Sequence, residues 1–147
     1  MAKMTFTGFN VEDKLEKLET GFRREVTHKV LWAGSKVLEK EMKNAISQNH
    51  HVITGSMRDS VAATEIVEDL DSSSVEVFTQ GIDSRGVSNE MKNKIINYGF
   101  YNKAAHSFRK QTDPYLRKLR KRLEPRLQAV MSEQFSICME EAGLKEE

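Results

Sequence analysis

Hydrophobic positions in the first third of the chain recur with the period of an α-helix. The repeat predicts one long helix, capped by Asn10 and ending near Gln48. One side of this helix carries the apolar residues Leu15, Leu18, Phe22, Val26, Val30, Ala33 and Val37. A second set projects from other directions and comprises Leu31, Leu38, Met42, Ala45 and Ile46. One core cannot easily cover both sets. Leu31, Leu38 and Met42 are therefore candidates for a subunit contact, unless the C-terminal helix folds over them.

A turn separates the long helix from a region of strand-like alternation. In residues 50–61, Thr54 and Ser56 can each cap a new helix start, and Gly55 tolerates backbone angles that other residues resist. Arg58 and Ser60 follow, and we expect them to be structural or interface groups.

Beyond Val61 the pattern predicts two antiparallel strands joined by a polar turn at residues 69–74. Thr64, Ile66 and Val67 lie in the first strand. Val75, Val77 and Thr79 should point to one face of the second. Two strands are marginally stable alone, so this pair must pack on a helix or extend into a larger sheet.

Two further helices complete the predicted elements. Ser88 caps a short helix that buries Met91, Ile95 and Ile96 and stops at Gly99. Asp113 caps the last helix, with Pro114 in its first turn and a kink expected at Pro125. The apolar stripe of that helix is Leu116, Leu119, Leu123, Leu127, Val130, Ile137 and Cys138.

The connection from Gly99 to Asp113 has fifteen residues and no apolar periodicity. Structureless loops of this length are uncommon in compact domains and tend to be functional or disordered. This one carries the aromatic residues Phe100, Tyr101 and Phe108 together with basic groups such as Arg109, a composition that suits docking on a partner. We expect it to be mobile in the free protein and ordered in an assembly, as we do the N-terminal arm, residues 1–9.

Size and charge restrict the fold and the compartment. The 147 residues suit a single domain, residues 1–147, and the element order predicts an α+β fold: long N- and C-terminal helices packed on a small antiparallel β-sheet. The net charge is only +1, so no global field favours nucleic acid. Neither a membrane span nor a secretory signal is present. The single cysteine, Cys138, excludes an internal disulfide and suits a reducing cytoplasm.

Candidate chemistry is sparse. The sequence has no phosphate-binding loop, dinucleotide motif or zinc-protease motif, so we predict no catalytic, cofactor-binding or metal-binding residues. The densest charge run is a basic face of the last helix, formed by Arg117, Lys118, Lys121, Arg122 and Arg126. Three interpretations stay open for it: a solvated surface, a docking site for an acidic protein, or a nucleic-acid-binding module.

Three short motifs occur in an informative order. Thr54-Gly55 followed by Arg58 and Ser60-Val61 comes first, then Tyr98-Gly99, then Pro114-Tyr115-Leu116-Arg117. This order resembles that of the tail-completion, or head–tail joining, proteins of long-tailed bacteriophages and phage-tail-like particles. The resemblance spans about residues 4–135. Two positions depart from the family pattern, because Asn97 replaces the usual acidic residue before the aromatic-Gly pair and Phe100 replaces the usual Thr after it.

The resemblance implies a structural virion protein without enzymatic activity. Such proteins form a ring, six-fold by the symmetry of the tail, at the head-proximal end of the tail. Their partners are further copies of themselves, the tail terminator or tail-tube protein, and the neck or connector proteins. The resemblance leaves open whether they also contact the DNA that passes through the ring. The implied location is the tail or neck of the virion, assembled in the bacterial host cytoplasm, with no membrane partner.

Overall fold

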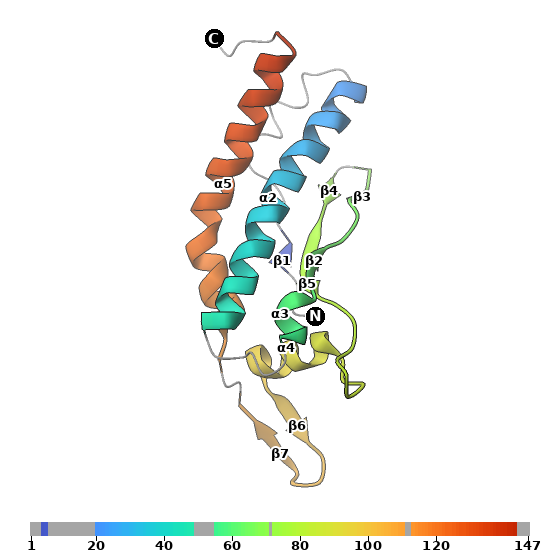
Figure 1. Ribbon diagram of the computed structural model, residues 1–147, viewed down its shortest axis with the longest axis vertical. Helices are drawn as coiled ribbons and strands as arrows, with labels where there is room; N and C mark the ends of the chain where they lie inside the picture. Colours follow the sequence, from blue (N-terminus) through green and yellow to red (C-terminus); the bar gives the residue numbers. More distant parts are fainter. Residues whose placement is uncertain (1–3, 6–19, 49–54, 71, 111–112, 144–147) are drawn as a thin grey trace.

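The structure is a computed structural model that describes residues 4–5, 20–48, 55–70, 72–110 and 113–143. Two long helices, α2 (Thr20–Gln48) and α5 (Tyr115–Glu141), run side by side as a stem (Figure 1). A small antiparallel sheet packs beside α2. The short helices α3 (Ser56–Asp59) and α4 (Asn89–Tyr98) lie at one end of the stem. The predicted α+β fold is confirmed.

The sheet has three antiparallel strands in the order β1-β5-β2. β2 (Val61–Ala63) pairs antiparallel with β5 (Glu76–Thr79), with Val61 opposite Thr79. The predicted antiparallel pairing of the two segments is confirmed, but the first strand ends before Thr64 and the polar turn lies in a different hairpin. Val75, Val77 and Thr79 are buried, as the alternation predicted. The strand expected around Thr64 to Val67 is interrupted, because a separate two-stranded hairpin, β3 (Val67–Glu68) and β4 (Ser73–Ser74), extends beyond the sheet.

The N-terminal arm contributes the third strand. β1 (Met4–Thr5) pairs with the outer edge of β5, with Met4 opposite Val77. Our prediction of a free arm is therefore wrong for these two residues, because the open edge of a strand offers backbone hydrogen bonds to any extended segment. The Asn10 cap and the first turns predicted for the long helix lie outside the described residues.

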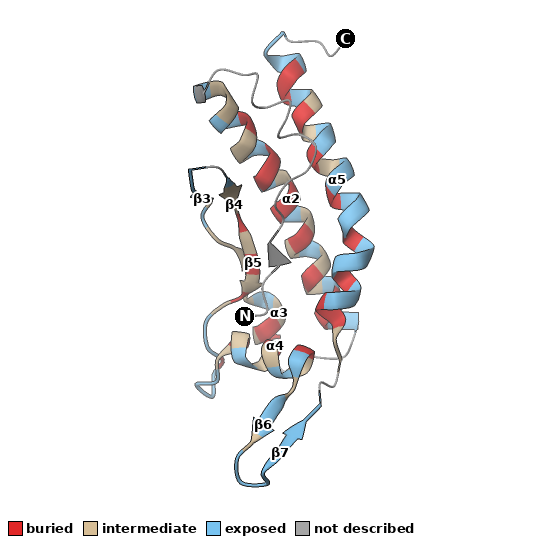
Figure 2. Cartoon of the chain, turned by 180° about the vertical axis from the view of Figure 1, so that it is seen from behind, coloured by how far each residue is buried: buried red, intermediate tan, exposed pale blue. Residues whose placement is uncertain are grey.

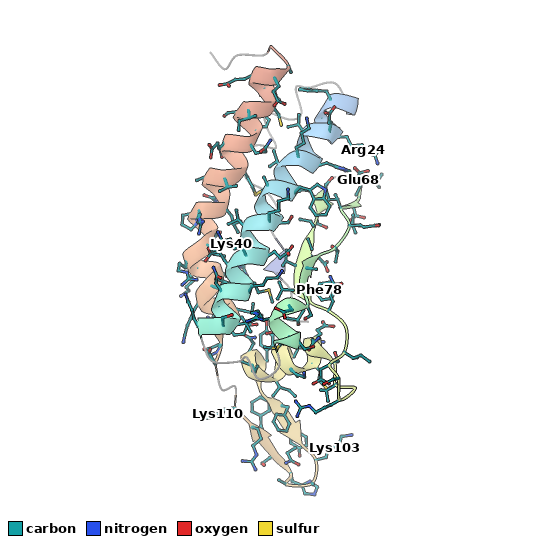
Figure 3. The ribbon with its side chains drawn as sticks, in the orientation of Figure 1. Arg24, Lys40, Glu68, Phe78, Lys103 and Lys110 are labelled. Carbon is teal, nitrogen blue, oxygen red and sulfur yellow. The ribbon has the colours of Figure 1, made fainter. Side chains whose placement is uncertain are left out.

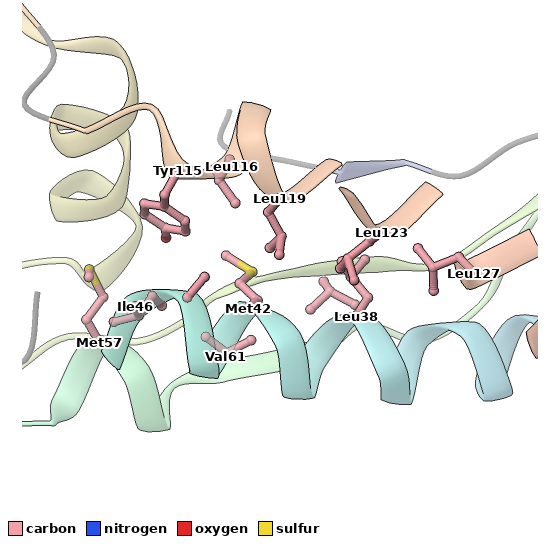
Figure 4. Packing of buried hydrophobic residues seen from close by; sticks show 12 residues of the cluster. Leu38, Met42, Ile46, Met57, Val61, Tyr115, Leu116, Leu119, Leu123 and Leu127 are labelled. Atoms are coloured by element: carbon pink, nitrogen blue, oxygen red, sulfur yellow. The ribbon is translucent and has the colours of Figure 1, made fainter. Parts of the chain in front are cut away.

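The core lies mainly between α2 and α5 (Figure 4). Leu38 and Met42 are 2% and 1% exposed and pack in one buried cluster with Leu119, Leu123 and Leu127 of α5. Leu31 is also buried, in the neighbouring cluster that contains Met131 and Phe135. The assignment of Leu31, Leu38 and Met42 to a subunit contact is thus wrong. The alternative, that the C-terminal helix folds over these residues, is confirmed, because α5 covers the second apolar face of α2.

Helix α5 differs from its prediction at both ends. It begins at Tyr115, one residue later than expected, with Pro114 at the N-cap position. Its buried stripe continues in steps of four through Met131 and Phe135, whereas Val130 is half-buried and Ile137 is 40% exposed. The predicted stripe is therefore correct as far as Leu127 and wrong at Val130 and Ile137. The helix is continuous through the exposed Pro125, and the kink there stays a prediction.

A close approach between the two long helices accounts for a glycine inside α2. A Cβ atom on Gly34 would lie 3.2 Å from Cγ and Sδ of Met131. Glycine weakens a helix interior, but here it allows α2 and α5 to pack closely.

Candidate protein interface at helix α4 and the β6–β7 hairpin

Helix α4 buries polar side chains and exposes apolar ones. Asn89, Asn93 and Asn97, spaced four residues apart, are 2%, 0% and 3% exposed. Met91 and Ile95 are 58% and 38% exposed, so our prediction that they are buried is wrong. Of the predicted buried side, Ile96 alone packs against the core. The side of α4 that is buried is therefore set by hydrogen bonds to its asparagines rather than by its apolar residues. Figure 2 shows the buried and exposed parts of this helix.

Asn97 joins the end of α4 to the start of α5. Its Oδ1 accepts a hydrogen bond from the backbone N–H of Leu116 at 3.0 Å. Its Nδ2 donates to the carbonyl oxygen of Asn93 at 2.8 Å and to Oδ1 of Asn93 at 3.1 Å. The first N–H groups of a helix have no partner within the helix, so Asn97 acts as a cap from outside it. An acidic residue, usual at this position in the resembling family, could accept the same bond.

Asn93 and Tyr115 form the centre of this buried network. The Tyr115 hydroxyl donates to Oδ1 of Asn93. Burial raises the pKa of Tyr115 well above its usual range, so the hydroxyl stays a neutral donor. Nδ2 of Asn93 and Oγ1 of Thr79 are buried without a hydrogen-bond partner in the described chain.

Asn89 connects the network to the Thr-Gly motif. Its Nδ2 donates to the carbonyl oxygen of Gln80 at 2.9 Å and lies 3.3 Å from Oγ of Ser56. Ser56, next to Gly55 of the first motif, and Tyr115 and Leu116 of the third motif thus contact the buried side of α4. The second motif, Tyr98-Gly99, ends the same helix.

The turn at Gly55 is built as the sequence suggested, with one difference. Gly55 has φ 78° and occupies the N-cap position of α3 without a side-chain cap; Ser56 faces Asn89 instead of capping the helix. Ser60 is structural, because its Oγ donates to the carbonyl oxygen of Met57 at 2.8 Å. Arg58 is 38% exposed in its side chain and binds Asp59 at 2.8 Å, which leaves it accessible to a partner. Thr54, His50 and His51 lie outside the described residues.

The segment after Gly99 is a β-hairpin, not the structureless loop that we predicted. β6 (Phe100–Asn102) pairs with β7 (Ser107–Arg109), with Tyr101 directly opposite Phe108. An aromatic pair across two strands stabilises a hairpin, and this pair was visible in the sequence but unrecognised. Gly99 has φ 76° and ends α4, as predicted. The hairpin projects beyond α4, away from the stem (Figure 1).

Most of the exposed large apolar side chains of the described chain gather in this region. We call this surface the α4–hairpin patch; it comprises Ile82, Val87, Met91, Ile95, Tyr98, Phe100, Tyr101 and Phe108. Exposed apolar residues that occur singly need no explanation, but a contiguous group of them marks an interaction surface. The candidate contact residues Phe100, Tyr101 and Phe108 belong to this patch, and Arg109 adjoins it on β7, whereas Arg58 is on α3.

Asp83, which our reading of the sequence missed, fixes the loop beside this patch. Its Oδ1 accepts from the N–H groups of Arg85 at 2.8 Å and Val87 at 2.9 Å, and its Oδ2 lies 2.5 Å from Nζ of Lys92 on α4. These bonds hold the pKa of Asp83 far below its usual range, and the bond from Lys92 has the largest effect. The signal was an aspartate followed by Ser-Arg-Gly, a sequence typical of a turn closed by the aspartate side chain.

The basic face of α5 is partly neutralised by its neighbours. Arg122 and Arg126 pair with Glu41 of α2 at 3.7 and 2.9 Å, and Lys118 pairs with Asp113 at 3.5 Å. Arg117 and Lys121 are exposed and make no ion pair with a described residue. The face is therefore not a continuous cationic surface, which disfavours the nucleic-acid-binding module.

Other classes of site find no support in the described ranges. Within them, no three His, Cys, Asp or Glu side chains are grouped to hold a metal ion. Cys138 is buried, as predicted. No helix among these residues has the length and apolar character needed to cross a membrane.

The chain matches one family of phage proteins. Residues 10–81 match the HK97-gp10-like family, whose description is "Bacteriophage HK97-gp10, putative tail-component". Neither a curated protein nor a solved structure matches the chain. The matched region contains the described part of α2, the Gly55 turn and the β2–β5 pair. The family agrees with the resemblance to phage tail-completion proteins that the three motifs indicate.

Proposed function

We propose that this chain is the protein that joins the finished phage tail to the head. Its residues 10–81 match the HK97-gp10-like family, which is described as a tail component. Copies of the chain form a ring, six by the symmetry of the tail, at the head-proximal end. The ring lies between the tail tube or tail terminator and the neck or connector proteins. Its role is structural, and its location is the virion.

The orientation of α4 is the observation that carries this proposal. Helix α4 buries three asparagines and exposes Met91, Ile95 and Tyr98. It therefore has an apolar surface that remains in contact with solvent in the folded chain. On an ideal helix, the positions of these three exposed residues lie about 170° around the axis from those of the asparagines. The aromatic residues of the adjoining hairpin extend the surface. An interface protein needs such a surface, because apolar and aromatic side chains dominate the buried centres of protein contacts.

A phage that cannot make this chain tests the proposal. We expect a stop codon in its gene to yield filled heads and finished tails that stay separate, as seen by electron microscopy of the lysate. Supplying the wild-type chain from a plasmid should restore joined particles. Joined particles at normal yield without the chain would contradict the proposed function, as would a block at an earlier stage of tail growth.

A further inference from the structure

Two hairpins of opposite charge stand on different parts of this molecule. The β3–β4 hairpin carries Glu65, Glu68 and Asp69, and no basic residue occurs between residues 65 and 74. The β6–β7 hairpin carries Lys103, Arg109 and Lys110, and no acidic residue occurs between residues 99 and 112. All six of these charged residues are exposed.

Each hairpin also exposes apolar side chains beside its charges. Val67 and Leu70 on the acidic hairpin are 56% and 104% exposed. Tyr101 and Phe108, paired on the basic hairpin, are 57% and 58% exposed. The two surfaces are therefore complementary in charge, and each offers apolar side chains that a contact could bury.

The acidic hairpin is held in place by one of its own carboxylates. Glu68 lies 2.8 Å from Nε of Arg24 and 2.5 Å from Nε2 of His28, both on α2. The hydrogen bond from Arg24 is the main cause that holds the pKa of Glu68 below its usual value, and the hydrogen bond from His28 is the second cause. Glu65 and Asp69 make no ion pair with a described residue, so their charges are available to a partner.

The two hairpins are separated along the long axis of the molecule. Arg24 and Glu68 lie near one end and Lys103 and Lys110 near the other (Figure 3). Figures 1 and 2 agree that the β6–β7 hairpin projects away from the stem, beyond α4. Contact between the two hairpins thus requires two molecules.

We propose that the β6–β7 hairpin of one copy docks on the β3–β4 hairpin of the next copy. Phe108 and Tyr101, which share one face of the hairpin, then cover Leu70 and Val67. Arg109, on the opposite face of the strand, and Lys110 bring positive charge close to Glu65 and Asp69. A contact between two different surfaces of the same chain is heterologous, and it closes into a ring when the rotation between neighbours allows. This inference rests on the proposed ring and names the surfaces that build it.

A charge-swap experiment tests the contact. Variant A, Arg109→Glu with Lys110→Glu, has two acidic hairpins. Variant B, Glu65→Lys with Asp69→Lys, places lysines where Arg109 and Lys110 would dock and leaves Glu68 and Asp71 in place. Sedimentation velocity at low ionic strength measures the association of each full-length chain. We expect wild type to associate, each variant alone to stay monomeric because like charges meet, and an equimolar mixture of A and B to associate again.

A matched control separates this contact from a general effect of charge. Glu133→Lys with Glu140→Lys makes the same charge change as variant B on exposed residues of α5, which belong to neither hairpin. It should associate as wild type does. Circular dichroism should show that all variants are folded, since every substituted side chain is exposed. The proposal is overturned if A or B alone associates like wild type, or if the mixture associates no more than its components.

Engineered cysteines test the same contact within particles. A chain with Leu70→Cys and Phe108→Cys should form a ladder of disulfide-linked oligomers when particles are oxidised, because each copy then has one cysteine on each surface. Either single substitution should give no ladder, and the native Cys138 is buried. A double variant without a ladder, in particles that contain the chain and are joined normally, would overturn the proposed contact and leave the joining function standing. Loss of joining function is read separately from the phage that lacks the chain.

Discussion

At the scale of single residues, Asn97 is the group that ties α4 to α5. Replacing Asn97 by Ala removes the acceptor of the Leu116 N–H and the donor to Asn93. Both groups are buried, and a buried polar group left without a partner costs about 1–3 kcal/mol. We therefore expect Asn97→Ala to lower the free energy of unfolding by about this amount, measured by urea denaturation.

The exposed side of the same helix provides the control for this substitution. Met91→Ala truncates a side chain that is 58% exposed and introduces a good helix former. Its free energy of unfolding should stay within about 0.5 kcal/mol of wild type. Equal destabilisation by both substitutions would mean that Asn97 has no special role in holding α5.

Because of Asp83, we expect the free energy of unfolding to decrease at acid pH. Its pKa is far below the usual value in the folded protein, mainly because of Lys92. The contribution of this carboxylate is therefore present above its unfolded pKa, near 4, and is lost as the pH falls towards the folded pKa. In Asp83→Asn this dependence should disappear. The difference between the urea midpoints of wild type and Asp83→Asn should shrink between pH 7 and pH 3; a constant difference would contradict this account.

At the scale of elements, α4 has one side for folding and another for a partner. Replacing both Met91 and Ile95 by Gln should change the unfolding midpoint little, because both side chains are already in water. The same double variant should fail to restore joined particles in a phage that lacks the chain, because the apolar surface is gone. Normal joining by this variant would remove the α4 side of the patch from the proposed interface.

Leu38 provides the contrast within α2. It is 2% exposed and packs against α5, so Leu38→Ala should lower the free energy of unfolding by about 2–5 kcal/mol. Replacement by Glu should unfold the isolated chain, because it buries an unpaired charge. A folded Leu38→Glu monomer that fails only in assembly would instead support the subunit contact that the structure argues against.

At the scale of the whole molecule, the stem and the projecting hairpin should differ in local stability. The stem buries a continuous core, whereas a two-stranded hairpin with exposed side chains is marginally stable by itself. Trypsin should cut the free protein first at Lys103, Arg109 or Lys110 and leave α2 and α5 intact. Protection of these sites in joined particles is the expected result, and mass spectrometry of the fragments measures it. Equal resistance in both states would mean that the hairpin is already rigid without a partner.

Several features of this protein were determined by the sequence alone. The periods of the apolar residues gave α2 and α5, the alternation after Val61 gave the β2–β5 pair, and Ser88 and Gly99 marked the ends of α4. These signals are local, because caps, glycine conformations and periodicity depend on neighbours in the chain. The order of the three motifs likewise indicated the phage tail family.

Only the tertiary structure decided which face of each element is covered. Sequence periodicity cannot say that α5 lies over Leu38 and Met42, because both apolar faces of α2 are equally suited to burial. For α4, sequence periodicity predicted the wrong face to be buried, because Met91 and Ile95 are exposed. Asparagines are buried there because Tyr115 and Leu116 of α5, and Gln80 just after β5, supply their hydrogen-bond partners. The exposed patch of α4 and the hairpin is a consequence of that pairing, which no local pattern in the chain records.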